Sequence, residues 1–282
     1  MRNTHRIWIA GANGRLGQAI YKLLDLCEYE VLNTDIEDVD ITNAEEVITF
    51  SDRNRFDIIV NCAGMTDLDE CEKNLEMAYK VNALGARNLS IAARKYDSKI
   101  IHISTDDVFG GSKTSPYTEF DLPNPTTVYG KSKLAGEFFV KEFAPRHMII
   151  RSSWLYGEGD SFVKAILDAA DNSTSVKVAV DQVASPTSAV ELAKFIVSIM
   201  NTSEYGTYHA TCKGQCSRFE FAKEILKAAG KQADIIPVTT GESVTSDRPR
   251  YTVLDNFMLR ISGVYEMKNW QTALEEYIKK LN

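Results

Sequence analysis

The 282-residue sequence has no apolar run close to the roughly 20 residues that a membrane-spanning helix needs. Its first residues, MRNTHRIWIAGANG, lack the apolar core and cleavage site of a signal peptide, so we expect a cytoplasmic protein with no membrane partner. Positive charge is not in excess either, since the formal net charge is −7 with acids and bases mixed along the chain. Nucleic-acid binding requires a basic patch, so no nucleic-acid partner is expected.

Cysteine is scarce and forms no regular pattern. The five cysteines are odd in number and scattered, which argues against structural disulfides: Cys27, Cys62, Cys71, Cys212 and Cys216. Cys212 and Cys216 are four apart, but no second Cys or His pair at ligand spacing accompanies them. The stretch MTDLDECE holds four carboxylates in eight residues, which is more typical of a solvated helix start than of a metal site. We therefore predict no metal site and no need for a divalent ion.

Short apolar runs alternate with amphipathic stretches in the first half of the chain. Strands are expected at residues 6–11, 29–35, 56–64, 99–109 and 147–157, and helices at 15–26, 44–53, 74–96 and around 128–137. Strands that alternate with helices predict right-handed βαβ units. The expected fold is therefore α/β, with a doubly wound parallel sheet of the Rossmann type.

The alternation becomes looser after residue 155. Helices are expected at 161–171, 188–200, 217–230 and 270–282, and strands at 176–183 and 206–211. Ser217 and Glu220 form a capping-box pattern at the start of the third of these helices, and Gly230 ends it. We expect a dinucleotide-binding domain of residues 1–151 and about 176–210. A smaller C-terminal α/β lobe, of about 152–175 and 211–282, would bind the substrate.

A glycine-rich turn joins the first expected strand to the first helix. Gly11, Gly14 and Gly17 are three apart in GANGRLG, which permits a tight turn and close approach of the backbone to a pyrophosphate. Asp35 ends the second strand, where it can accept a hydrogen bond from the ribose 2′-hydroxyl of NAD and repel the 2′-phosphate of NADP. Arg15 could pair with that phosphate instead. We give Asp35 more weight, so NADH is favoured over NADPH.

A second group of residues predicts carbonyl reduction. HISTDDVF brings Ser104, Thr105 and Asp106 to a strand end, and Tyr129 and Lys133 are four apart on the next expected helix. The tyrosine would protonate the oxyanion that forms when a hydride reaches carbon. The lysine ammonium and the positive ring of the cofactor would together lower the tyrosine pKa from near 10. Thr105 would orient the carbonyl oxygen.

Together these features resemble the extended short-chain dehydrogenase/reductases, and more narrowly the dTDP-4-dehydrorhamnose reductases. The similar stretches follow in order along nearly the whole chain: GANGRLGQAI, DVDITN, VNCAGMTDLDECE, VNALGARNL, STDDVF, PYTEFDLPNPTTVYGKSKLAGE, RSSWLYG, DQVASPT, RPRYTVLD and WQTAL. The resemblance implies reduction, with NAD(P)H, of the 4-keto group of dTDP-4-dehydro-L-rhamnose or a related dTDP-4-keto-6-deoxy sugar. The product would be dTDP-L-rhamnose for cell-surface polysaccharide.

The resemblance also implies which residues form the site. The catalytic residues would be Thr105, Tyr129 and Lys133. The cofactor would contact Gly11, Asn13, Gly14, Arg15, Leu16, Asp35, Asp40, Ile41, Cys62, Ala63, Gly64, Asn82, Tyr129 and Lys133. The substrate would contact Thr105, Asp106, Tyr129, Trp154 and Arg248, with the Arg248 guanidinium on the pyrophosphate. The alternative for Arg248 is a surface salt bridge to Asp247 or Asp255.

The sequence departs from the family pattern at four places. Asp107 stands where the family usually has the tyrosine of STDYVF, Ala184 replaces a glycine in DQVASPT, and Ser161 replaces an asparagine. Gly64 and Met65 stand where AAYT is common. All but Gly64 bear on the substrate side, so the reaction type is better defined than the sugar.

Two other functions remain open from the sequence. A nucleotide-sugar dehydratase or epimerase of the same superfamily would need an acid–base carboxylate pair, for which Asp106 and Asp107 are available. A non-catalytic regulatory subunit, like the methionine adenosyltransferase β-subunit, could keep the tyrosine and the lysine. The pattern leaves the oligomeric state open between a monomer and a homodimer.

Overall fold

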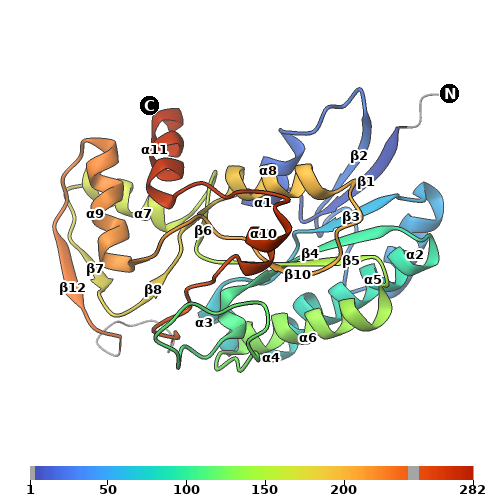
Figure 1. Cartoon of the computed structure of the whole chain (residues 1–282), viewed down its shortest axis with the longest axis horizontal. Coiled ribbons are helices and arrows are strands. Elements are labelled where there is room, and N and C mark those ends of the chain that lie inside the picture. The colour runs from blue at the N-terminus through green and yellow to red at the C-terminus, as the bar shows by residue number, and fades with distance from the viewer. Residues whose placement is uncertain (1–3, 241–247, 282) are drawn as a thin grey trace.

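A parallel sheet of six strands forms the larger part of the computed structural model, which describes residues 4–240 and 248–281 (Figure 1). The strands lie in the order β2–β1–β3–β4–β5–β10, and all neighbouring pairs are parallel. Their bounds are Tyr29–Thr34, His5–Ala10, Ile58–Asn61, Lys99–Thr105, His147–Ser152 and Gly206–His209. The predicted doubly wound α/β fold is confirmed.

Helices cover both faces of this sheet. On one face, α1 (Arg15–Tyr21) and α8 (Ala189–Ile199) pack over Ile7 and Ile9 of β1. On the other face, α2 (Ala44–Asn54), α5 (Ala86–Lys95) and α6 (Val128–Phe143) lie over a second core that includes Trp8 (Figure 1). Because both faces are covered, the central strands are apolar without alternation, and all four residues of β3 are buried.

Two of the expected helices differ from the structure in detail. The stretch expected as one helix over 74–96 consists of α4 (Leu75–Tyr79), a π-helical turn at Lys80–Gly85 and α5. It follows α3 (Leu68–Lys73), whose N-cap is Asp67, so the MTDLDECE stretch is a helix start as expected. The helix expected to reach residue 26 ends at Tyr21, because the amides of Leu23 and Leu24 bond three residues back and tighten the chain into a turn.

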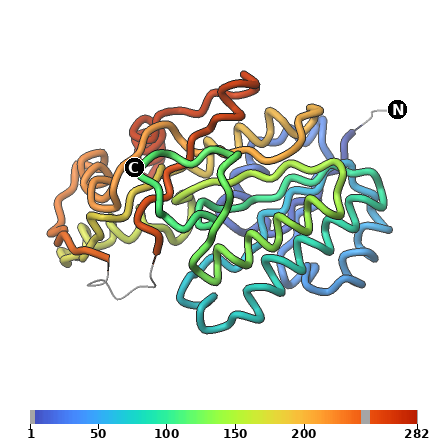
Figure 2. Tube along the Cα trace, turned by 60° about the horizontal axis from the view of Figure 1, so that its bottom comes forward, coloured from blue at the N-terminus to red at the C-terminus, as the bar shows by residue number. Residues whose placement is uncertain are grey.

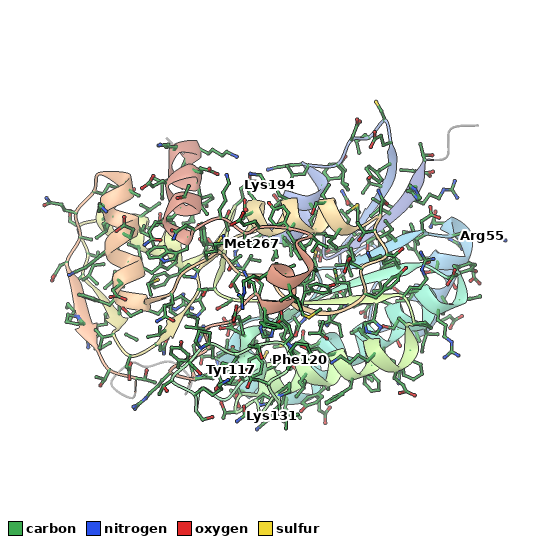
Figure 3. The ribbon with its side chains drawn as sticks, viewed as in Figure 1. Arg55, Tyr117, Phe120, Lys131, Lys194 and Met267 are labelled. Carbon is green, nitrogen blue, oxygen red and sulfur yellow. The ribbon has the colours of Figure 1, made fainter. Side chains whose placement is uncertain are left out.

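The smaller part lies beside the large sheet (Figure 2) and has its own core of packed side chains (Figure 3). Tyr156, Phe221, Trp270 and Tyr277 pack there between α7 (Phe162–Asp171), α9 (Arg218–Ala229) and α11 (Trp270–Leu281). The capping box of Ser217 and Glu220 is formed. Three strand pairs complete this part: β7 (Val176–Ala179) with β12 (Ile235–Val238), β6 (Leu155–Tyr156) with β9 (Thr187–Ser188), and β8 (Val183–Ala184) with β11 (Cys216–Ser217).

The strand pairing places one segment in a different part of the protein from the one that we expected. We expected residues from about 176 onward in the dinucleotide-binding domain, but β7 pairs with β12 and its Val178 joins the smaller core. The segments α8 and β10 do pack with the large sheet. Of the helices that the structure describes, none is long and apolar enough to cross a membrane.

Candidate active site

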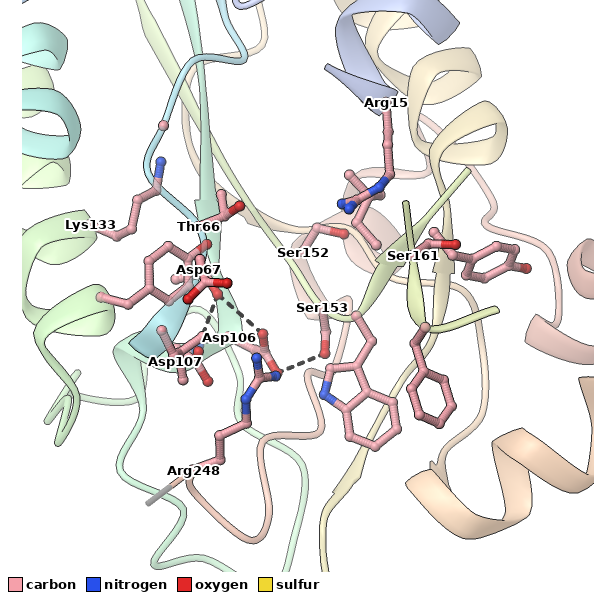
Figure 4. Close-up of a pocket in the computed structure, with 18 of the residues that line it drawn as sticks. Arg15, Thr66, Asp67, Asp106, Asp107, Lys133, Ser152, Ser153, Ser161 and Arg248 are labelled. Atoms are coloured by element: carbon pink, nitrogen blue, oxygen red, sulfur yellow. Dashed lines mark hydrogen bonds between the residues drawn. The ribbon is translucent and has the colours of Figure 1, made fainter. Parts of the chain in front are cut away.

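A cavity of about 870 Å³ opens where the two parts meet, at the carboxyl ends of the central strands (Figure 4). The chain leaves β1 toward β2 on one side and returns to β3 on the other, so the cavity lies at a topological switch point, where doubly wound sheets bind ligands. Twelve of the residues predicted for the site line it: Gly14, Arg15, Leu16, Cys62, Ala63, Gly64, Thr105, Asp106, Tyr129, Lys133, Trp154 and Arg248.

The glycine turn forms one end of the cavity, and two of its glycines permit no side chain. A Cβ on Gly11, whose φ is +76°, would lie 2.5 Å from the Ala63 amide nitrogen, and a Cβ on Gly17 would lie 2.5 Å from the Gly11 carbonyl oxygen. Gly14 is the N-cap of α1 and supplies no capping side chain. The turn therefore leaves backbone amides at the cavity, which fits the phosphates of a dinucleotide.

Asp35 and Arg15 lie at the glycine turn, but both side chains form hydrogen bonds with backbone groups of the protein. The Asp35 carboxylate accepts hydrogen bonds from the amides of Asn13, at 3.1 Å, and Ile36, at 2.9 Å. The Arg15 Nε donates to the Asp160 carbonyl oxygen at 2.7 Å, and a second guanidinium nitrogen donates to the same oxygen. Arg15 thus bridges the glycine turn to the smaller part of the protein.

The remaining predicted cofactor residues lie behind the cavity wall. Asn82, in the π-helical turn, pairs through its side chain with both backbone groups of Met65 and donates to the Ser132 hydroxyl at 2.9 Å. Asp40 accepts from the Thr42 amide, and Ile41 is buried against Gly85. Gly11, Asn13, Asp35, Asp40, Ile41 and Asn82 support the loops around the cavity rather than lining it.

Thr105, Tyr129 and Lys133 meet at the end of β4. The Lys133 Nζ donates to the Ile103 carbonyl oxygen at 2.5 Å, and burial lowers the pKa of Lys133 to about 8 against the opposing effect of Glu137. Burial, and then the charge of Asp107, raises the pKa of Tyr129 above its ordinary value of 10, while a hydrogen bond with Thr105 acts in the other direction. In the protein alone, the Tyr129 pKa is thus shifted in the direction opposite to the lowering that we expect from Lys133 and the cofactor together.

A buried carboxylate holds Thr105, the threonine predicted to be catalytic. Asp106 accepts hydrogen bonds from the hydroxyls of Ser153 at 2.7 Å, Thr252 at 2.5 Å and Thr105 at 3.2 Å. Figure 4 shows the bond between Asp106 and Ser153. Burial raises its pKa, although the bonds from Thr252 and Ser153 oppose that shift. Sequence reasoning missed Ser153 and Thr252, but Ser153 stands next to Trp154 in the RSSW stretch, which could have indicated it.

Asp107 lines the same cavity as Asp106, but its electrostatic environment is different. Burial, followed by repulsion from Asp106, raises the pKa of Asp107 to about 7, and the nearby Arg248 and Arg218 oppose this shift. The Asp107 amide donates to the Thr105 hydroxyl at 3.1 Å. This departure from the family pattern therefore adds a second carboxyl group beside Thr105.

The wall opposite the glycine turn combines aromatic rings and guanidinium groups. Trp154 lies in the left-handed region at φ +44°, and the Arg218 Cζ is 3.7 Å from its ring centroid. Arg248 also lines this wall. Of the two salt-bridge partners considered for it, Asp255 pairs with Arg260, and Asp247 lies outside the described residues. Arg218 was not predicted, because no motif distinguishes it from other charged residues at helix starts.

The comparisons with known proteins identify the family. The chain matches the family described as "RmlD substrate binding domain" over residues 5–282. It belongs to this family. The sequence resemblance to dTDP-4-dehydrorhamnose reductases is thereby confirmed.

Three relatives illustrate the extent of the similarity. The crystal structure of a dTDP-4-dehydrorhamnose reductase from Clostridium acetobutylicum is 43% identical, with a TM-score of 0.95 over 98% of this chain and 99% of that chain. The enzyme of the same name from Bacillus anthracis, solved with NADP, is 39% identical, with a TM-score of 0.96 and the same coverage. The dTDP-4-dehydrorhamnose reductase of Aggregatibacter actinomycetemcomitans is 36% identical over 96% of this chain and 97% of its own length.

Proposed function

We propose that this protein reduces the 4-keto group of dTDP-4-dehydro-L-rhamnose, or of a closely related dTDP-4-keto-6-deoxy sugar, with NAD(P)H. The main support for the proposal is that Thr105, Tyr129 and Lys133 line the same cavity as the glycine turn. The names of the relatives agree with this chemistry. Conversion of a ketone to an alcohol in this cavity would give dTDP-L-rhamnose.

The glycine turn, Ala63, Gly64 and Lys133 would hold the dinucleotide. When bound, a reduced nicotinamide supplies the hydride that converts the ketone carbon to an alkoxide. Lys133 is 4% exposed, and its ammonium is held by a hydrogen bond to the Ile103 carbonyl oxygen. The ammonium would therefore be preorganised to bind the nicotinamide ribose.

Tyr129 would supply the proton. Because its pKa is raised, the phenol is protonated at neutral pH and can donate to the oxygen that becomes negative as the carbonyl is reduced. Thr105 would hold that oxygen through its hydroxyl, which accepts a hydrogen bond from the Asp107 amide and whose hydrogen would turn from the Asp106 carboxylate to the developing oxyanion. The positioned hydroxyl and phenol would stabilise the alkoxide before it takes the proton.

We also propose that Asp35 makes NADH the preferred cofactor. Its carboxylate stands at the end of β2 beside the glycine turn, where a 2′-phosphate would meet its negative charge. Arg15, the group that could attract that phosphate, is engaged by the Asp160 carbonyl oxygen. The relative from Bacillus anthracis was solved with NADP, so the two cofactors need a direct comparison.

The decisive test is an assay of NADH and NADPH oxidation with dTDP-4-dehydro-L-rhamnose, with the product identified by NMR. The proposal expects cofactor consumption to depend on the sugar nucleotide, with dTDP-L-rhamnose as the product. Conversion of the sugar without net cofactor consumption would instead identify an epimerase or a dehydratase. No conversion of any dTDP-4-keto sugar, with the cofactor still bound, would favour a regulatory subunit.

A further inference from the structure

The two consecutive carboxyl groups after β4 have opposite hydrogen-bond environments. The Asp106 carboxylate accepts from three hydroxyl groups, which belong to Thr105, Ser153 and Thr252. Asp107 is 8% exposed, and within the described part of the chain its carboxyl group has neither a hydrogen-bond partner nor a cation within 4 Å. Hydrogen bonds donated to a carboxyl group favour its ionised form, and burial without them favours the neutral form. Of the two groups, Asp106 is therefore the one that loses its proton first.

The charged groups around Asp107 leave its titration close to neutral pH. Ionisable side chains line the cavity around it on five segments: Asp106 of the 3₁₀ turn Asp106–Val108, Asp67 before α3, Tyr129 and Lys133 of α6, Arg218 of α9, and Arg248 after β12. Burial, and then repulsion from Asp106, raises the pKa of Asp107 to about 7, although the two arginines oppose the shift. Figure 4 shows Asp106, Asp107 and Arg248 grouped on one side of the cavity. The guanidinium groups thus already act on this pair, and even so Asp107 keeps its proton up to about pH 7.

The backbone holds Asp107 at the end of the cavity where the ketone would react. The Asp107 amide donates to the Thr105 hydroxyl at 3.1 Å, and the Asp107 carbonyl oxygen lies so close to Gly130 of α6 that a Cβ there would overlap it. Tyr129 is the neighbouring residue on α6, and after burial the charge of Asp107 is the largest cause of its raised pKa. A ligand whose ketone oxygen is held between Thr105 and Tyr129 would therefore place its adjacent carbon atoms beside the Asp107 carboxyl group.

The proposed substrate would favour the neutral form of Asp107 still further. Its diphosphate brings negative charge into the cavity, its sugar displaces water, and reduction creates an oxyanion beside Thr105. Each of these changes raises the pKa of a nearby carboxyl group. A neutral carboxyl group can donate a hydrogen bond to a sugar hydroxyl, which an ionised carboxylate cannot do.

We propose that Asp107 binds the sugar of the substrate in its neutral form, as a hydrogen-bond donor to a hydroxyl group next to the ketone, so that the nucleotide sugar binds together with one proton. The inference rests on the proposed function and deepens it. The proton comes from the solvent and stays on Asp107 during the reaction, because Tyr129 supplies the proton that the alkoxide takes. The tyrosine that the family pattern usually has at this position would remain protonated throughout the neutral range, since phenols titrate near 10. Asp107 thus makes substrate binding in this chain depend on pH.

The first test measures the proton with a ligand that cannot react. Titration calorimetry with dTDP-L-rhamnose, on protein saturated with NADH, would compare buffers of different ionisation enthalpy at about pH 8. The ligand itself takes up no proton at this pH, because each of its phosphates is linked on two sides. Wild type should take up about one proton per ligand bound, and Asp107→Asn should take up none. Asp234→Asn, at an exposed position in the smaller part, is the control and should behave as wild type.

The second test measures the affinity between about pH 6 and pH 8, below the pKa of about 9 of Arg218. Because the required proton has a pKa of about 7 in the free protein, the Kd of dTDP-L-rhamnose should rise about tenfold over this range in wild type. The Kd of Asp107→Asn should stay constant, since its amide donates at every pH. Asp107→Leu is neutral but has no donor, so it should bind about three- to tenfold more weakly than Asp107→Asn. An NADH titration of each variant would verify that the protein is folded.

Three results would overturn the inference. These are a wild-type Kd that does not change with pH, a wild-type pH dependence in Asp107→Asn, and equal proton uptake with the methyl ester of dTDP, which carries the same diphosphate charge but no sugar.

The two proposals fail separately. The absence of proton uptake in an enzyme that reduces dTDP-4-dehydro-L-rhamnose would overturn the role of Asp107 alone. Asp107-dependent proton uptake in a protein that reduces no dTDP-4-keto sugar would overturn the proposed function and leave the sugar-binding role of Asp107 in place.

Discussion

Glu137 and Arg151 form a fully buried ion pair behind the residues predicted to be catalytic. Arg151 Nε and its Nη2 donate to the two oxygens of Glu137 at 2.8 and 2.7 Å, and the Ser104 hydroxyl donates to one of them at 2.6 Å. Glu137 lies one helical turn beyond Lys133 on α6, and Arg151 belongs to β5. The pair thus fixes the helix that carries Tyr129 and Lys133 to the sheet.

Removal of the carboxylate charge should therefore destabilise the fold. Glu137→Gln leaves the Arg151 guanidinium buried and unpaired, so the free energy of unfolding should fall by about 3–5 kcal/mol. Urea denaturation would measure the loss, with Glu142→Gln, an exposed position of the same helix, as the control. Equal stability of the two variants would mean that the ion pair contributes little to holding α6.

Tyr129→Phe should leave the fold and NADH affinity close to wild type and lower turnover by about 10²–10⁴, the scale of a lost general acid. The phenol is the group expected to deliver the proton, and the phenyl ring preserves the packing. Steady-state kinetics and a cofactor titration would separate the two effects. Tyr21→Phe, at an exposed position on α1, is the matched control. Turnover retained in Tyr129→Phe would point to another proton donor.

Asp107→Asn should change how stability depends on pH. The pKa of Asp107 is about 7 in the folded protein and 3.8 as its ordinary value, so between these values the folded state binds more protons than the unfolded state. The contribution of Asp107 to the free energy of unfolding is thus fully present below about pH 4 and decreases as the pH rises toward 7.

The variant carries no such titration, so its stability relative to wild type should increase over this window. Urea titrations at several pH values would measure the difference. Asp234→Asn, at an exposed position in the smaller part, should show no comparable trend. A flat difference for Asp107→Asn would mean that the Asp107 carboxyl has the same pKa in the folded and the unfolded protein.

Asp35→Ala should shift cofactor preference toward NADPH. The substitution removes the negative charge that a 2′-phosphate would meet, and we expect the ratio of kcat/KM for NADPH over NADH to rise about tenfold, or ~1.4 kcal/mol. Asp35→Asn keeps an acceptor for the Asn13 amide and so tests the charge without loss of the loop contact. An unchanged ratio in both variants would place Asp35 away from the adenosine ribose.

The sequence predicted those parts of the fold and the site that depend on local patterns. Tyr129 and Lys133 share a helix face because of their spacing, and Thr105 follows a strand whose end must lie near that helix. The long helix over 74–96 was predicted, but its π-helical turn was not, because that turn depends on the contacts of Asn82 with Met65 and Ser132.

The parts that sequence reasoning missed depend on contacts between distant segments. Arg218 reaches the cavity only because Trp154 and Phe162, more than fifty residues earlier, stack on it. The pKa of Tyr129 rises because the helix start is buried beside Asp107, and local spacing does not reveal that burial. Long-range packing therefore determines the electrostatics of the site.

The position of β10 at the edge of the large sheet has a consequence for synthesis on the ribosome. β5 ends at Ser152, but the strand that pairs with its outer edge begins only at Gly206, after the chain has passed through α7, β7 and α8. A nascent chain that has completed β5 thus carries an open row of amide and carbonyl groups until β10 emerges. A ribosome paused between these strands would expose an edge able to pair with other chains.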